Sequence, residues 1–294
     1  MTRRLLIDTD PNIHLRMRDI DDALAILFCV ASPEVKVEGI TVNFGNVKTP
    51  VGFQAAGDIL RAAGADIPVF QGAAGPDDLG RANEAVEFLI DTVRENPGEM
   101  TLLALAPLTN VATACMLDKG FAAGLAGLVI MGGTLDFWVF KYIGEFNLHQ
   151  DTRAAAVVIS QPVAKTLITA DVCSQAVFRD EHLARLRRNK SDVSRLCADF
   201  IEPWLKLNRK VFFRKKGFFP WDVVAASYLV DHTLFEDNPC TFEIVEKGLG
   251  RGRLVNVKRA GGMQAGNGKR PVNMPLKLDG TRFMDLFLER LSRL

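Results

Sequence analysis

The N-terminal region of this sequence concentrates carboxylates. Five aspartates fall within fifteen residues: Asp8, Asp10, Asp19, Asp21 and Asp22. Carboxylates this close together cannot all ionise unless a cation neutralises them. Because they are hard oxygen ligands and no cluster of Cys or His accompanies them, the pattern favours Ca²⁺ or Mg²⁺ over zinc. Asp19 to Asp22 would also suit a helix N-terminus, but two acidic motifs on adjacent elements favour a metal site.

Further polar residues lie directly after expected strands or at the start of an expected helix. They are Asn43, Asn46, Glu145, Asn147, Asp171 and Asp222. In open parallel sheets the ligand site lies beyond the carboxyl ends of the strands. We therefore expect these side chains and the aspartates to gather at one edge of a sheet.

The elements that must position them alternate between short apolar strands and helices. Strands are expected over 4–8, 35–44, 68–71, 100–106, 125–131 and 163–171. Helices are expected over 20–30, 51–63, 83–95 and 151–160, with another opened by Pro107. This alternation predicts an α/β fold with an open, mostly parallel central sheet and helices on both faces.

The C-terminal third follows another pattern. Residues 181–211 predict two charged helices, 222–230 and 280–294 predict one helix each, and 241–258 predict a β-hairpin that turns at 248–252. No internal repeat and no Ser- or Pro-rich linker interrupts the chain. We therefore expect a single domain over 1–294.

Composition excludes several classes of protein. The 294 residues carry 36 basic and 35 acidic side chains, a formal net charge of +1, which argues against nucleic acid or an anionic membrane as the main partner. The apolar runs are too short to span a bilayer, and the N-terminus lacks the apolar stretch of a secretory signal. Five cysteines without CxxC spacing indicate reduced thiols. We expect a cytoplasmic protein without disulfides.

The motifs resemble those of the inosine–uridine nucleoside hydrolase family. The opening signature of that family, DTDPGxDDA, is matched by DTDP at 8–11 and, after an insertion, by DIDDA at 19–23. GN at 45–46, LTN at 108–110, MGG at 131–133, EFN at 145–147 and a late Asp222 follow in the family's order. The resemblance implies Ca²⁺-dependent cleavage of the N-glycosidic bond of ribonucleosides.

The resemblance also implies a role for each matching residue. Asp10, Asp22 and Asp222, with the backbone carbonyl of Leu105, would bind Ca²⁺, and Asp10 would take a proton from a Ca²⁺-bound water that attacks the anomeric carbon. The remaining matches would bind the nucleoside: Asp21 and Asn46 at the ribose hydroxyls, Glu145 and Asn147 at the 5′ side, and Met131 along the pocket. Such a site stabilises an oxocarbenium-like transition state. The family further implies a homodimer or homotetramer.

Two departures from the family pattern concern the loops around the site. Residues 12–18 interrupt the opening signature, and we expect their His14, Arg16 and Arg18 to lie over the pocket. The segment 71–83 is short where the family has a long mobile loop. The insertion is either an inert bulge or, as we hypothesise, a replacement for part of the missing lid.

Two further departures concern the base and the sugar. Trp221 stands immediately before Asp222, where the pyrimidine-tolerant branch has a histidine, and it suggests stacking on a purine. It would alternatively only pack against its aromatic neighbours at 218–219, while Phe137 and Trp138 could supply the opposite face. Val139 stands where the family often has a ribose-binding asparagine.

A basic run at 210–216 precedes Trp221. Such a run is typically a solvated face, and the alternative is that it attracts an acidic substrate.

Three functions remain open at this point. The leading prediction is a purine-preferring nucleoside N-ribohydrolase that releases free base and ribose. A relative with altered specificity, or one that only binds a ribosylated ligand, is the second. The third is a haloacid-dehalogenase-type phosphatase with Asp8 as nucleophile, which is disfavoured because Asn12 stands where that family needs Thr or Val.

Overall fold

A nine-stranded sheet forms the centre of the described part of the chain, in the order β3-β2-β1-β4-β5-β6-β10-β8-β9. This computed structural model describes residues 2–137, 144–189, 191–211, 217–248, 250–259 and 271–294. Strands β1 to β6 run parallel to their neighbours, whereas β8 pairs antiparallel with both β10 and β9. The prediction of an open, mostly parallel sheet is confirmed.

The strands lie close to the predicted segments. Their bounds are β1 Arg3–Thr9, β2 Val35–Val42, β3 Val69–Gln71, β4 Met100–Ala104, β5 Gly127–Met131, β6 Lys165–Ile168, β7 Phe235–Glu236, β8 Pro239–Ile244, β9 Leu254–Arg259, β10 Val272–Asn273 and β11 Lys277–Leu278. The predicted hairpin is β8 and β9, and it extends the main sheet through β10. The two-residue strand β10 carries too little sequence pattern to be expected.

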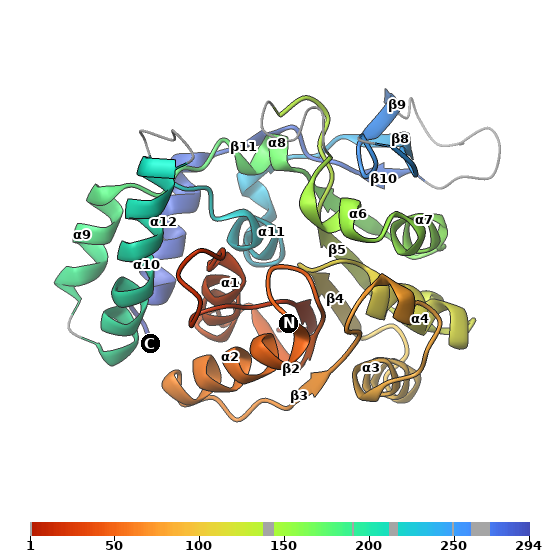
Figure 1. The fold of residues 1–294 in the computed structure, drawn as a ribbon, viewed down its shortest axis with the longest axis horizontal. Helices are drawn as coiled ribbons and strands as arrows, with labels where there is room; N and C mark the ends of the chain where they lie inside the picture. Colours follow the sequence, from red (N-terminus) through yellow and green to blue (C-terminus); the bar gives the residue numbers. More distant parts are fainter. Residues whose placement is uncertain (1, 138–143, 190, 212–216, 249, 260–270) are drawn as a thin grey trace.

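Helices cover both faces of this sheet, as Figure 1 shows. Their bounds are α1 Asp21–Val30, α2 Thr49–Ala62, α3 Glu84–Glu95, α4 Thr109–Leu117, α5 Phe121–Gly124, α6 Phe146–Gln150, α7 Thr152–Ser160, α8 Ala170–Cys173, α9 Asp180–Arg188, α10 Asp192–Val211, α11 Trp221–Val230 and α12 Gly280–Leu291. Among the described helices, none is both long enough and apolar enough to cross a membrane.

Alternate residues of β1 face two separate hydrophobic cores. Leu5 and Ile7 pack on the side of α1, α2 and α11, whereas Leu6 packs on the side of α3, α4 and α7. This is the period-two alternation of a strand that is covered on both faces. The helices α9, α10 and α12 lie together at one end of the molecule, on the left in Figure 1.

Several predicted strand boundaries differ from the structure by a few residues, and one of these differences bears on a predicted site residue. The strand expected over 163–171 ends at Ile168, and Asp171 lies in α8. The Asp171 carboxylate accepts hydrogen bonds from the backbone N–H of Leu135 at 2.7 Å and of Asp136 at 2.9 Å. Asp171 therefore fastens the loop that follows β5, and its carboxylate is committed to backbone contacts.

Candidate active site

A cavity of about 410 Å³ lies at the carboxyl ends of the central strands. Its lining includes every residue for which a metal, catalytic or substrate role was expected: Asp10, Asp21, Asp22, Asn46, Leu105, Met131, Glu145, Asn147, Trp221 and Asp222. Its other lining residues are Met17, Arg18, Asp19, Phe146, Trp204 and Asn208. The sheet has thus brought together residues that are far apart in the sequence.

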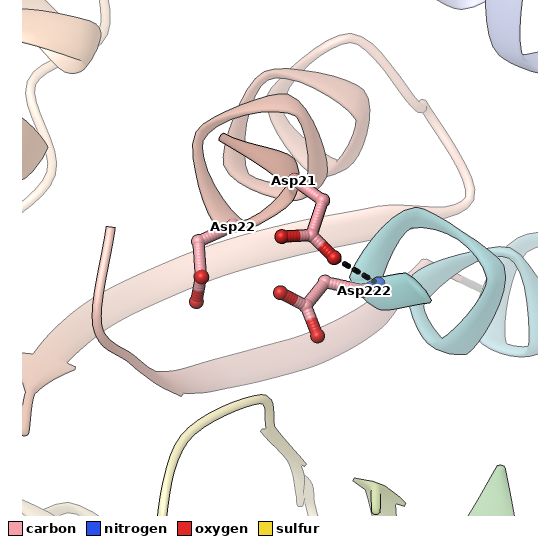
Figure 2. A group of neighbouring side chains, drawn as sticks. All are labelled: Asp21, Asp22 and Asp222. Carbon is pink, nitrogen blue, oxygen red and sulfur yellow. Dashed lines mark hydrogen bonds between the residues drawn. The ribbon is translucent and has the colours of Figure 1, made fainter. Parts of the chain in front are cut away.

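Three of the lining carboxylates, Asp21, Asp22 and Asp222, lie close together (Figure 2). Asp21 and Asp22 open α1, and Asp222 lies in the first turn of α11. Each offers a carboxylate oxygen within 4.8 Å of the others, and none is more than 4% exposed. The backbone N–H of Asp222 donates to Asp21 Oδ2 at 3.2 Å, so the packing of α1 on α11 fixes the group.

The end of β1 holds Asp22 and Asp10 in register. Asp22 Oδ1 accepts a hydrogen bond from Thr9 Oγ1 at 2.5 Å and another from the backbone N–H of Asp10 at 3.1 Å. The backbone N–H of Asn46 donates to Asp10 Oδ2 at 2.6 Å. Gly45 allows this approach, because a Cβ there would lie 1.9 Å from Asp10 Oδ2.

Asp8 lies beneath the cavity and does not line it. Its Oδ1 accepts hydrogen bonds from Thr41 Oγ1 at 2.6 Å and from Asn110 Nδ2 at 2.8 Å. Burial raises the pKa of the Asp8 carboxyl to about 6. Asn110 also accepts from the backbone N–H of Ala73 at 2.9 Å. Asp8 and the LTN asparagine therefore brace the floor of the site.

The carboxylates of the cavity raise one another's pKa. Burial is the largest cause for Asp10, Asp21 and Asp222, whose pKa values lie well above the ordinary range, and the neighbouring aspartates add to it. Within the described residues, no Lys, Arg or His forms an ion pair with them. A buried group of oxygen donors that no described basic side chain neutralises fits a hard divalent cation.

The EFN segment forms a second group of hydrogen-bonded residues in the same cavity. Glu145 caps α6 and accepts backbone hydrogen bonds from Asn147 at 2.7 Å, Leu148 at 3.1 Å and Gly133 at 2.8 Å. Asn147 Nδ2 in turn donates to the carbonyl of Leu105 at 2.7 Å. The side chain of Asn147 thus orients the carbonyl that the family resemblance assigned to the metal.

The C-terminal hairpin supports the EFN segment from the outside. His149 Nδ1 contacts the carbonyl of Arg251 at 3.1 Å, and Arg251 Nε donates to His149 Nε2 at 3.1 Å. Gly144, with a φ of +75°, and Gly252, with a φ of +85°, let the two backbones meet, because a Cβ on either would clash with the other segment. A contact between segments 102 residues apart therefore helps to position Glu145.

The inserted loop 12–18 is anchored at both ends. Asn12 is fully buried and bonds to the backbone of Leu15 in both directions, at 2.8 and 2.9 Å. Asn46 accepts from the backbone N–H of Asp19 at 3.1 Å and donates to its carbonyl at 2.9 Å. Asn46, for which a ribose contact was predicted, therefore also holds the end of the insertion.

The basic residues of the insertion do not all line the cavity. Arg18 lines the cavity, as predicted. The same expectation was wrong for His14, which pairs with Asp58 at 3.0 Å, and for Arg16; both line a neighbouring hollow. The reason is that the short loop turns over Asn12 and directs its first half towards α2 and α10.

Trp221 lines the cavity and is supported by aromatic packing. It packs edge-on against Phe137, with ring centroids 5.6 Å apart, and in a tilted arrangement against Phe219, with ring centroids 4.8 Å apart. Phe137 is thus part of the packing behind Trp221, and the expectation that it faces Trp221 across the cavity was wrong. The other expectations in this region, on Trp138, Val139 and 212–216 of the basic run, lie outside the described residues.

Sequence reasoning missed two residues on α10. Trp204 and Asn208 both line the cavity, and Asn208 Nδ2 donates to the carbonyl of Trp204 at 3.0 Å. Their spacing of four residues places them on one helix face. The available signal was a tryptophan and an asparagine four residues apart within an expected helix.

Comparison with known proteins agrees with this geometry. The model of the family described as "Inosine-uridine preferring nucleoside hydrolase" matches residues 5–285. A probable uridine nucleosidase 2 of Oryza sativa subsp. japonica is 31% identical over 68% of this chain and 67% of its own length. Uridine nucleosidase 1 of Arabidopsis thaliana is 29% identical over 94% of this chain and 89% of its own length.

Solved structures show the same fold. A plant nucleoside hydrolase superposes with a TM-score of 0.87 at 26% identity, covering 99% of both chains. An inosine-guanosine nucleoside hydrolase superposes with a TM-score of 0.82 at 25% identity, also covering 99% of both chains. The family match spans nearly the whole chain, including all the motifs that meet in the cavity. This chain therefore belongs to the inosine-uridine preferring nucleoside hydrolase family.

Proposed function

We propose that this protein is a Ca²⁺-dependent ribonucleoside hydrolase that prefers purine nucleosides and releases free base and ribose. The observation that carries the proposal is the cavity itself. Its lining combines a buried group of aspartates with two tryptophans, Trp204 and Trp221, and a nucleoside needs both kinds of contact. The names of the relatives, which include uridine nucleosidases, support the reaction class.

The proposed cation ligands are Asp10, Asp22, Asp222 and the carbonyl of Leu105. The tight group of carboxylates contains Asp21 together with Asp22 and Asp222, and Asp10 adjoins Asp22 through its backbone N–H. Oxygen donors of this kind suit Ca²⁺, which accepts high and irregular coordination. When bound, the cation acidifies a water and orients the ribose diol.

Asp10 is the proposed general base. Its Oδ2 is held by the N–H of Asn46 at 2.6 Å, and its pKa is raised by burial and by the charge of Asp22. A carboxylate with a raised pKa accepts a proton more readily than one in water. The attacking oxygen bonds to the anomeric carbon, its proton goes to Asp10, and the N-glycosidic bond breaks with its electron pair on the base.

The remaining residues bind the substrate. Asp21 and Asn46 would contact the ribose hydroxyls, Glu145 and Asn147 the 5′ side, and Met131 the sugar pocket. Buried carboxylates around the sugar stabilise the positive charge that develops on it. Trp221 would stack on the base and raise the basicity of a purine ring nitrogen, which favours its departure in the protonated form.

The test is a panel of purine and pyrimidine ribonucleosides incubated with the purified protein in Ca²⁺, with release of base and ribose measured. We expect purine nucleosides to be the better substrates. EDTA and Asp222→Asn should abolish release, whereas Asp192→Asn, a change at a 93% exposed side chain, should leave it intact. Activity that survives both EDTA and Asp222→Asn would refute the metal site, and faster release from uridine would refute the purine preference.

Two further predictions stay untested by the structure. The family resemblance implies a homodimer or homotetramer, which light scattering in solution would establish. Cytoplasmic localisation is the second, and fractionation of the source cells would establish it.

A further inference from the structure

A second hollow of about 420 Å³ lies beside the proposed active site. The inserted loop forms one wall with Ile13, Leu15 and Arg16, and α10 forms the facing wall with Leu196, Phe200 and Trp204. The hollow is comparable in volume with the main cavity. It owes its loop wall to the insertion that interrupts the family signature.

The two spaces are adjoining parts of one binding region. Arg18 and Trp204 line both of them. Trp204 lines the main cavity together with Trp221. A base stacked on Trp221 would therefore occupy a cavity that shares two wall residues, Arg18 and Trp204, with the second hollow.

The chemistry of this hollow is amphipathic. Its apolar lining comes from the loop and from α10, while Arg16 and Arg18 contribute guanidinium groups at exposed positions. Neither arginine forms an ion pair with a described residue, and His14 is already paired with Asp58. Asp199 supplies one carboxylate on the α10 wall. The two arginines outnumber it, so the hollow favours an anion at its rim.

We propose that the second hollow binds a substituent on the leaving base, one with an apolar stem and an acidic end. This inference rests on the proposed nucleoside hydrolase function and names its substrate class: purine ribonucleosides whose exocyclic nitrogen carries a carboxylated group. The stem lies against Leu196 and Phe200, and Arg16 binds the carboxylate. An unsubstituted nucleoside fills only the main cavity.

The test compares three nucleosides: adenosine, succinyladenosine and the dimethyl ester of succinyladenosine, which keeps the stem but lacks the charge. Initial rates with Ca²⁺ provide kcat/KM for each, and calorimetric titration provides the affinity of each for the protein. We expect the acid to exceed its ester by about tenfold, the low end of what a charge-assisted hydrogen bond contributes. Arg16→Gln should remove most of that ratio.

Two matched variants complete the test. Arg195→Gln removes a charge from the same helix, where Arg195 pairs with Asp192, and should leave the acid-to-ester ratio unchanged. Leu196→Trp fills the hollow and should lower kcat/KM for both substituted nucleosides relative to adenosine. Melting curves establish that each variant is folded.

The outcomes separate this inference from the proposed function. If adenosine is cleaved but acid and ester are equal, or Arg16→Gln leaves their ratio intact, the subsite is refuted while the function stands. If no nucleoside is cleaved, the function fails, and the titrations alone decide the subsite. Tighter binding of the acid that depends on Arg16 would support it, and equal binding of acid and ester would overturn it.

Discussion

Gly45 offers a direct test of how the backbone positions the proposed general base. Its φ is +152°, a region that residues with a Cβ rarely adopt. A Cβ at this position would lie 1.9 Å from Asp10 Oδ2 and 2.9 Å from Pro107 Cδ. Gly45→Ala therefore forces the Asp10 carboxylate to move and strains the turn that carries Asn46.

The size of the effect follows from these distances. Asp10 Oδ2 must shift by about 1.5 Å to restore an ordinary contact of 3.4 Å, and it then loses the 2.6 Å bond from Asn46. Misplacing a catalytic group by about 1 Å costs roughly a hundredfold in rate. We expect kcat/KM to fall by about a hundredfold, near 2.7 kcal/mol. The backbone strain should lower the free energy of unfolding by about 1–3 kcal/mol.

Steady-state kinetics on the preferred nucleoside and urea unfolding measure the two effects separately. Gly75→Ala is the matched control, because Gly75 has extended backbone and its Cβ would meet nothing within 4 Å. That variant should keep both activity and stability. The reasoning is refuted if Gly45→Ala retains kcat/KM within about threefold of wild type, or if Gly75→Ala loses as much.

Three other predictions concern pH, the hairpin and the insertion. Burial raises the pKa of Asp8 to about 6 in the folded protein, so in EDTA its contribution to stability is present at low pH and falls as pH rises from the unfolded value through about 6. Relative to Asp8→Asn, wild type should thus lose roughly 3 kcal/mol between pH 3 and 7 in urea unfolding, and a constant difference would contradict this. Arg251→Ala removes the bond to His149 Nε2 and should lower kcat/KM about threefold, whereas Arg188→Ala, on α9, should not; equal effects would exclude a positioning role for the hairpin. Deletion of 13–18 should lower kcat/KM without changing the melting temperature, and a fully active deletion would show the insertion to be inert.

Periodicity and motif spacing predicted the main elements of this fold. The continuous apolar run of β1, which is buried on both faces, and the capping asparagine Asn83 that accepts from the N–H of Val86 are properties of neighbouring residues and can be read from the sequence. The grouping of polar residues at strand ends also followed from a general rule of parallel sheets. Short elements such as β10 and α8 were beyond this reasoning, because two to four residues carry too little pattern.

The sequence by itself determined which chemistry the chain can carry: a set of aspartates, the EFN motif and a tryptophan before the last aspartate. Only the tertiary structure decided which of them meet. Asp222 reaches Asp21 across 201 residues because α11 packs on α1, and Arg251 reaches His149 because the hairpin extends the sheet. Likewise the insertion meets α10 and encloses a second hollow. Hydrogen-bonding patterns along a strand or helix are local, whereas contacts between helices depend on how whole faces pack, which no short window of sequence contains.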